Sequence, residues 1–226
     1  MTDVADPALS PRAQQTRAAI TDAALELFRS LGYEATTMRA VAQRAGVSTG
    51  NAYYYFDSKE ELIQEFYARS HAEHLAASRA VLDHETDFTA RLRGTLRALI
   101  DVQAPYHAFA ATFYKHAAEP TSPLSPFSKQ SSPTREASIG LYREVIDGSD
   151  ARVGGDLGDR LPELLWLASM GVVLYWVHDT SPGCVRTYRL IDAAVPVIGQ
   201  LVAASRIPVL RATLRDVTAL IDDLRS

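Results

Sequence analysis

Cysteine and long apolar runs are both scarce in this sequence of 226 residues. The single cysteine, Cys184, excludes an internal disulfide and is typical of a protein in a reducing compartment, so a cytoplasmic location is expected. The longest apolar stretch, Leu164–Val177, has 14 residues, whereas a membrane-spanning helix needs ~20. We therefore expect this stretch to be a buried helix.

Motifs for catalysis and for cofactor binding are missing as well. The sequence has no phosphate-binding glycine loop, no nucleophile beside a base and no credible set of metal ligands, so no catalytic residue, metal or cofactor is predicted. His71 and His74 could share a metal ion, but two nitrogens are too few, and a solvated helix face is favoured. Cys184 lies near a predicted helix start, where a dipole could lower the pKa of a redox-active thiol; an inert thiol is the favoured interpretation.

Strand patterns are also absent, and signals for helices dominate the sequence. The composition, with 47% hydrophobic and 22% charged residues, is ordinary for a globular protein, and an all-α fold is expected. The first ten residues lack the basic start and the apolar core of a signal peptide. Residues 1–10 are therefore predicted to form a disordered tail.

Capping residues predict where the first helix begins and ends. Ser10 and Pro11 provide an N-cap and a proline at the first helical position, and Gly32 can end the helix in a left-handed conformation. Apolar residues recur at helical spacing between these ends. They predict a buried face that consists of Ile20, Ala24, Leu27, Phe28 and Leu31.

Two short helices joined by a turn are predicted to follow. Thr36 or Thr37 caps the second helix, Gly46 ends it, and Ser48 caps the third helix almost at once. The inward face of the second helix is expected to consist of Met38, Val41, Ala42 and Ala45.

The remainder of the chain is predicted to be helical too. Ser58 and Glu61 form a capping box that opens a long fourth helix, which ends near Ala80. The proline- and serine-rich segment 119–133 is predicted to be a loop. Further helices are expected at residues 87–103, 105–118, 133–147, 159–179, 184–204 and 207–224.

The run Thr36–Lys59 has the layout of a helix-turn-helix. In this motif one helix braces across the DNA backbone and the next helix lies in the major groove. In the predicted third helix, Asn51 can pair with adenine, and Thr49 can offer a methyl group to thymine or a hydroxyl to phosphate. Gly50 lets the backbone come close to the DNA.

Four consecutive aromatic residues end this third helix, and helical geometry points them in different directions. Tyr53 and Tyr55 are favoured as DNA contacts, because a phenol can donate to a phosphate oxygen while its ring packs against a sugar. Tyr54 and Phe56 are favoured as core residues. The helix is thus expected to serve both the core and the DNA.

Local charge is compatible with DNA binding although the formal net charge of the chain is −4. Residues 10–59 contain more basic than acidic side chains, so the negative balance lies elsewhere. Lys59 can add a charge contact with the help of the N-terminal amides of its helix, and Thr37 can contact phosphate from the second helix. The predicted DNA contacts are Thr37, Ser48, Thr49, Gly50, Asn51, Tyr53, Tyr55 and Lys59.

These elements resemble a known family. Residues 16–62, about a fifth of the chain, are similar to the N-terminal domain of TetR/AcrR-type transcriptional regulators. The matching elements are F-R-S-L-G-Y, T-T-M-R-A-V-A-Q-R-A-G-V-S, G-N-A-Y-Y-Y-F and S-K-E-E-L. The positions at which this family contacts DNA correspond here to Thr37, Ser48, Thr49, Asn51, Tyr53, Tyr55 and Lys59.

The resemblance implies a domain organisation and a function. Residues 11–57 would form the DNA-binding domain, and residues 58–226 a larger helical domain for effector binding and dimerisation. The expected protein is a homodimer that binds a palindromic operator, usually as a repressor, and is released by a small-molecule effector. The alternative is a helical adaptor whose surface at Ser48–Lys59 meets a protein instead of DNA.

Two predicted helices, at residues 159–179 and 184–204, are hydrophobic on more than one face, which favours a partner surface. By resemblance they correspond to the pair that forms a four-helix dimer interface. A dimer would also place two recognition helices about 34–36 Å apart, as two adjacent turns of the groove require. The helix at 207–224 lies beyond the simplest plan of the family, and its role is open.

Aromatic residues of the larger domain are candidates for a ligand site, because their rings can line an apolar cavity and their polar tips can orient a ligand. Aromatic residues dominate protein cores as well, so the alternative is that most of them fill the core. The candidates are Phe109, Phe113, Tyr114, Trp166 and Tyr175.

Overall fold

The computed structural model describes residues 10–108, 110, 114, 117–119, 121–153 and 156–205. These residues form helices, turns and loops without a strand, which confirms the all-α prediction. Among them, no helix combines the length and the apolarity that crossing a membrane requires. Residues 1–9 of the predicted tail and the predicted helix at 207–224 lie outside the described residues. Ser10, the last residue of the predicted tail, caps the first helix.

The backbone divides into two compact units. The N-terminal unit consists of Met1–Arg69 and Ala108–Ser131, and the C-terminal unit of Ser70–His107 and Ser132–Ser226. A segment from the middle of the chain therefore belongs to the same unit as the predicted DNA-binding helices. The functional boundary after residue 57 stays a prediction.

Helix α1 (Pro11–Leu31) begins and ends where its capping residues predict. The hydroxyl of Ser10 accepts a hydrogen bond from the amide of Ala13 at 3.3 Å. Gly32 follows the helix with a φ of 86°, and its amide donates to the carbonyl of Phe28. The expected buried face is confirmed except at its edge, where Leu27 is half-buried and Leu31 is 56% exposed.

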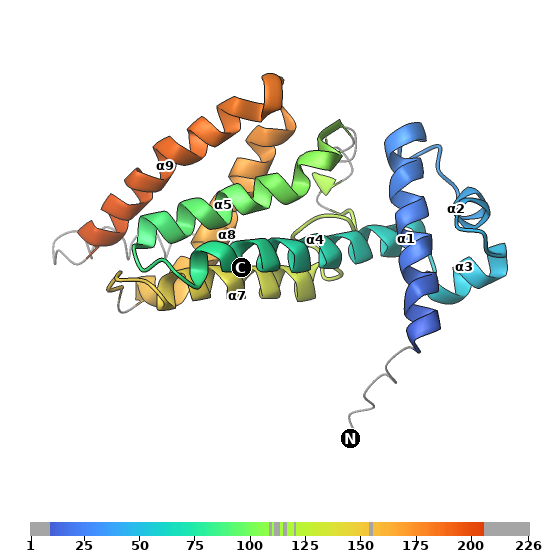
Figure 1. Ribbon diagram of the computed structural model, residues 1–226, viewed down its shortest axis with the longest axis horizontal. Coiled ribbons are helices and arrows are strands. Elements are labelled where there is room, and N and C mark those ends of the chain that lie inside the picture. The colour runs from blue at the N-terminus through green and yellow to red at the C-terminus, as the bar shows by residue number, and fades with distance from the viewer. Residues whose placement is uncertain are drawn as a thin grey trace. The chain divides into compact units, whose positions relative to one another are not determined.

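Helices α2 (Met38–Arg44) and α3 (Thr49–Tyr55) form the predicted helix-turn-helix, and α2 packs against both α1 and α3 (Figure 1). Thr37 is the cap of α2, since its hydroxyl accepts from the amide of Ala40 at 3.2 Å. Gly46 takes a φ of 70° in the turn, a conformation that glycine adopts without strain. Met38, Val41 and Ala42 are buried as expected, and Ala45 is half-buried.

Helix α4 (Lys59–Leu82) opens with the predicted capping box. The amide of Glu61 donates to the hydroxyl of Ser58 at 3.3 Å, and the carboxylate of Glu61 reaches back to the amide of Asp57 at 2.8 Å. Leu62 and Ile63 are completely buried in the first turns of the helix.

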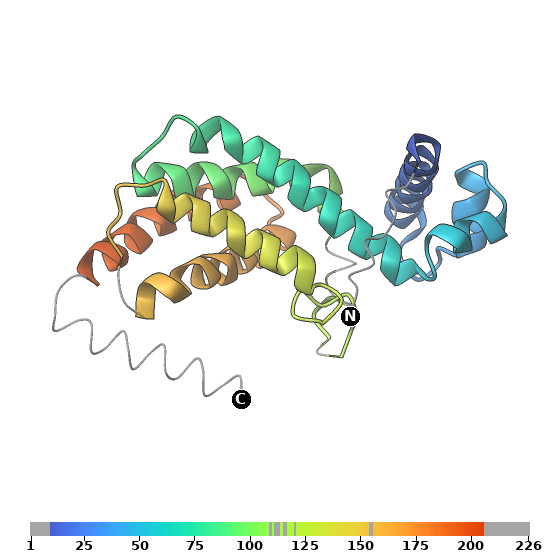
Figure 2. The same ribbon diagram turned by 90° about the horizontal axis from the view of Figure 1, so that it is seen from below.

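The C-terminal unit is a bundle of helices (Figures 1 and 2). After the last turns of α4 come α5 (Phe88–Gln103), η1 (Ala104–Tyr106), α7 (Ser132–Asp147), α8 (Asp156–Val177), η2 (Pro182–Cys184) and α9 (Val185–Ala204). Helix α5 packs against α7 and α9, and α7 packs along α8. The predicted helices at 87–103, 133–147, 159–179 and 184–204 are confirmed to within a few residues, and that at 105–118 lies partly outside the described residues.

A buried arginine joins three helices of this bundle. Arg91 on α5 is 4% exposed, and its guanidinium donates only to backbone carbonyls. The acceptors, at 2.6–3.0 Å, are the carbonyls of Leu82, Glu85, Glu144 and Val145. Because the last carbonyls of a helix lack partners within it, one side chain here satisfies the C-terminal ends of α4 and α7.

The two histidines of α4 do not form a solvated face, so that expectation is wrong. His74 is 4% exposed, and its Nε2 lies 2.9 Å from the carbonyl of Thr95 on α5. His71 is half-buried, with its Nδ1 3.1 Å from the hydroxyl of Ser138 on α7. No local pattern indicates that these histidines are buried, because both contacts come from other helices, α5 and α7.

This burial predicts a pH-dependent stability. Burial lowers the pKa of His74 to about 4, whereas an unfolded histidine titrates near ~6.5. The unfolded chain therefore binds the proton first as the pH falls, and the free energy of unfolding decreases between these two pKa values. We expect a loss of roughly 1.5 kcal/mol from this group between about pH 7.5 and 5.5, measured by urea unfolding. His74→Gln should flatten this dependence and His84→Gln, at an exposed position, should not; equal slopes in both variants would contradict the assignment.

Cys184 has the environment of an inert thiol. Burial and the charge of Asp179 raise its pKa, and the thiol lies 3.8 Å from the carbonyl of Asp179. The residue caps α9 in a left-handed conformation with a φ of 52°. Activation of the thiol by the helix dipole is therefore not supported.

Candidate nucleic-acid interface

Helix α3 presents most of its surface to solvent. Ala52 is completely buried and Phe56, which follows the helix, is 1% exposed. These two residues are four positions apart and share one face, which packs into the N-terminal unit. Thr49, Gly50 and Asn51 are exposed at the start of the helix, as a groove-binding surface requires.

The three tyrosines of α3 are not distributed as expected. Tyr54 is 77% exposed, so its assignment to the core is wrong, whereas Phe56 is confirmed as a core residue. The reason is geometric: each residue turns the helix by about 100°, so Tyr54 stands opposite the face of Ala52. Tyr53 is 49% exposed, and Tyr55 is half-buried with its ring edge-on to that of Tyr54 at 5.1 Å.

The two capping hydroxyls lie at exposed positions. Ser48 accepts from the amide of Asn51 at 3.1 Å, and Thr37 accepts in the same way at the start of α2. A hydroxyl that accepts one hydrogen bond still has its own proton to donate. Both residues can therefore hold a helix end and donate to a phosphate oxygen at the same time.

Lys59 is engaged within the protein. Its ammonium donates to the carbonyl of Tyr33 at 2.9 Å and lies 4.5 Å from the centre of the Tyr33 ring. The hydroxyl of Tyr33 donates in turn to Glu60 at 2.8 Å, and burial together with Glu60 raises the pKa of this phenol. An ammonium has three N–H donors, so Lys59 can still donate to a phosphate oxygen. Its contacts with Tyr33 hold the ammonium in one place while it does so.

Two exposed side chains near this surface were missed by the sequence reasoning. Arg39 on α2 is exposed and has no ion-pair partner within the part of the chain that the structure describes, whereas Arg17 and Arg44 are paired. Tyr54 is the other. Both could have been found from the spacing, since each falls outside the apolar face of its own helix.

The predicted ligand residues are widely distributed. Phe109 and Phe113 lie outside the described residues. Tyr114 is half-buried and belongs to the N-terminal unit. Trp166 is 3% exposed and Tyr175 is 42% exposed, and nine residues of helix place them on opposite sides of α8. The structure does not bring these two side chains to one cavity wall.

Helices α8 and α9 have exposed apolar faces. On α8, Leu174 and Tyr175 are each 42% exposed, so the stretch expected to be a buried helix is buried on one face only. On α9, Val197 is 53% and Leu201 is 59% exposed. Gly171 lies on α8, and a Cβ at this position would meet no heavy atom within 4 Å, so the surface of the helix is open there. Such a surface is typical of a partner interface.

A capped helix-turn-helix followed by a larger helical bundle defines the class of helix-turn-helix regulators. A family model described as "Bacterial regulatory proteins, tetR family" matches residues 20–66. A second, "Tetracyclin repressor-like, C-terminal domain", matches residues 91–220, more than half of the chain. The chain therefore belongs to the TetR family of transcriptional regulators.

Curated relatives match part of this chain. The chain is 50% identical to the transcriptional repressor KstR of Rhodococcus jostii over 62 residues, which are 27% of this chain and 29% of the relative. It is 31% identical to KstR2 of the same organism over 99 residues, 44% of this chain and 42% of the relative. The match thus spans less than half the length of either relative.

Solved structures share the fold over most of the chain. A TetR regulator from Nitrosomonas europaea has a TM-score of 0.63 at 17% identity, covering 81% of this chain and 97% of that one. FadR from Bacillus subtilis, in complex with stearoyl-CoA, has a TM-score of 0.62 at 16% identity, covering 79% and 96%. At these identities the likeness shows the fold alone.

Proposed function

We propose that this protein is a ligand-responsive repressor that binds a palindromic operator as a homodimer. The observation that supports the proposal best is the surface of α3, which is anchored through Ala52 and Phe56 and leaves its first turn exposed. The name of KstR, the relative with 50% identity over the matched region, supports repression. No catalytic role is included, and the working compartment is proposed to be the cytoplasm.

The exposed side chains are proposed to make two kinds of contact with DNA, to bases and to phosphates. Asn51 and Thr49 read base edges in the major groove, and Gly50 allows close approach of the backbone. The remaining contacts are to the phosphates and fix the register of the protein on DNA. These contacts are Thr37, Ser48, Tyr53, Tyr55 and Lys59, to which we add Tyr54 and Arg39.

Gly50→Ala separates DNA binding from folding. A Cβ at this position would meet no protein atom within 4 Å, and alanine stabilises a helix interior by up to ~1 kcal/mol relative to glycine. The variant should therefore fold at least as stably as the original protein. On the operator it should lose about 1–3 kcal/mol, the usual cost of forcing a methyl group into a packed interface.

Fluorescence anisotropy with operator DNA and urea unfolding measure these two effects separately. Gly140→Ala on α7 is the matched control, since a Cβ there also meets nothing within 4 Å. It should leave operator affinity unchanged. If Gly50→Ala binds as tightly as the control, α3 does not approach the DNA through Gly50.

The exposed apolar faces of α8 and α9 are proposed to form the dimer interface. Leu174, Tyr175, Val197 and Leu201 would be buried between two copies, while the open surface at Gly171 allows helices to approach closely. A symmetric dimer repeats the recognition helix about one helical turn of DNA away, which is why the operator is proposed to be palindromic.

The C-terminal unit is proposed to bind the effector. Two structures that share the fold are described as complexes with acyl-CoA: B. subtilis FadR with stearoyl-CoA and Thermus thermophilus FadR with lauroyl-CoA. They support a small-molecule site in this type of domain. Release requires that the effector bind more tightly to the conformation with low operator affinity.

The proposal is tested by selecting genomic fragments with the purified protein and then measuring affinity for a selected fragment at several salt concentrations. We expect enrichment of a palindromic sequence and a steep linear fall of log affinity with log salt, because phosphate contacts release counterions. Binding without sequence preference or salt dependence would favour the alternative, a helical adaptor.

A further inference from the structure

Segment 121–131 lies in the N-terminal unit, with the helices proposed to bind DNA, although it is distant from them in the sequence. It contains two successive turns, Ser-Pro-Leu and Ser-Pro-Phe, at residues 122–127. The amide of Ser125 donates to the carbonyl of Ser122 at 3.1 Å, and the amide of Ser128 to the carbonyl of Ser125 at 2.9 Å. A serine first and a proline second pre-set the backbone of each turn, so little entropy is lost on fixing the segment.

Two side chains of α4 hold this segment. The amide of Gln64 donates to the carbonyl of Pro123 at 2.8 Å and to the hydroxyl of Ser131 at 3.2 Å. One turn later, the hydroxyl of Tyr67 donates to the carbonyl of Leu124 at 3.0 Å. Leu124 itself is 2% exposed. The segment is thus attached to α4 near both of its ends, with Leu124 buried at the first attachment.

The same turns of α4 are bonded to the N-terminal helices. The guanidinium of Arg17 on α1 lies 2.6 Å from the carboxylate of Glu65, and Asp22 pairs with Arg69 one turn later. Tyr33, which follows α1, bonds to both Lys59 and Glu60. The first turns of α4 therefore lie between segment 121–131 and the helices that present the DNA-binding surface.

The chain leaves the N-terminal unit inside α4, after Arg69, and again at the start of α7, after Ser131. The bond between Gln64 and Ser131 ties the chain together close to both exits. We propose that Gln64 and Tyr67 are positioning residues for DNA recognition: they fix segment 121–131 on α4 and thereby hold α4 against the DNA-binding helices. This inference rests on the proposed function.

The test uses the full-length variants Gln64→Met and Tyr67→Phe, the second of which removes only one hydroxyl. Hydrogen exchange should become faster in segment 121–131. Operator affinity, measured by anisotropy at several salt concentrations, should fall about threefold to tenfold, the equivalent of one lost hydrogen bond. The slope of log affinity against log salt should stay unchanged, because no phosphate contact is removed.

Gln130→Met is the matched control, since Gln130 is exposed in the same segment. This variant should change neither the rate of hydrogen exchange in segment 121–131 nor the affinity for the operator. Unchanged affinity in both test variants, an altered salt slope, or unchanged exchange would each overturn the inference. Failure of the unmodified protein to bind DNA specifically would instead refute the proposed function, so the two failures are distinguishable.

Discussion

Leu201→Glu is expected to turn the proposed dimer into a monomer. The side chain is 59% exposed on α9, beside Val197, and the proposed interface would bury it against a second copy. A carboxylate there would have to be buried without a partner, which costs far more than the apolar contact contributes. Because two linked half-sites bind with an avidity gain of about 10²–10⁴, operator affinity should fall by roughly 100-fold or more.

Light scattering at micromolar concentration measures the loss of the dimer, and anisotropy measures the loss of operator affinity. Leu31→Glu is the matched control for oligomeric state, since Leu31 is 56% exposed but lies on α1. It should leave the dimer intact. A dimeric Leu201→Glu protein would place the interface elsewhere, and a monomeric starting protein would refute the proposed dimer.

Arg91→Met is expected to destabilise the protein by about 3–5 kcal/mol, the cost of leaving two or three buried carbonyls without a donor. This is a large part of the ~5–15 kcal/mol that stabilises a typical domain. The substitution removes a donor from four backbone carbonyls, of which that of Glu144 keeps the amide of Gly148 as a partner. Each buried carbonyl left unpaired costs about 1–3 kcal/mol. The position of this guanidinium also needs a glycine at residue 148, because a Cβ on Gly148 would clash with the guanidinium of Arg91.

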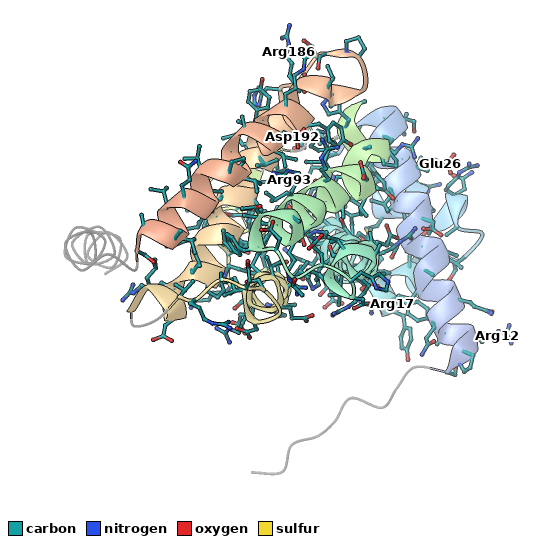
Figure 3. All side chains as sticks on the ribbon, turned by 60° about the vertical axis from the view of Figure 1, so that its left-hand side comes forward. Arg12, Arg17, Glu26, Arg93, Arg186 and Asp192 are labelled. Atoms are coloured by element: carbon teal, nitrogen blue, oxygen red, sulfur yellow. The ribbon has the colours of Figure 1, made fainter. Side chains whose placement is uncertain are left out.

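Urea unfolding at one fixed protein concentration measures the effect, since the proposed dimer would make stability depend on concentration. Arg93→Met, on the same helix, is the control. Its guanidinium is partly exposed and lies 3.5 Å from Asp192, so its loss should cost less than about 1 kcal/mol. Figure 3 labels both residues, Arg93 on α5 and Asp192 on α9. If both variants lose a similar free energy of unfolding, the buried hydrogen bonds of Arg91 do not stabilise the protein more than an exposed ion pair does.

Local signals were sufficient for the ends of the N-terminal helices. Ser10, Thr37 and Ser48 each accept a hydrogen bond from the amide three residues later, and Gly32 and Gly46 take the positive φ that a helix end or a turn needs. These interactions span only a few residues. The order of residues therefore determines them almost independently of the rest of the fold.

Side-chain direction was harder to predict where adjacent residues share a type. The sequence predicts both Tyr54 and Phe56 as core residues, and only Phe56 lies there. Composition alone cannot rank neighbouring aromatic residues. The completely buried Ala52 fixes which face of α3 turns inward, and this small residue was the signal that would have separated them.

The sequence by itself determined an all-helical chain with a capped helix-turn-helix, because helix periodicity, caps and turns depend on neighbours in the chain. Only the tertiary structure decided that His74 is a buried neutral base, that Arg91 closes the ends of two helices, and that segment 121–131 is held by Gln64. Each of these depends on a partner that is remote in sequence. Such partners meet only when the chain has folded, so no local pattern encodes them.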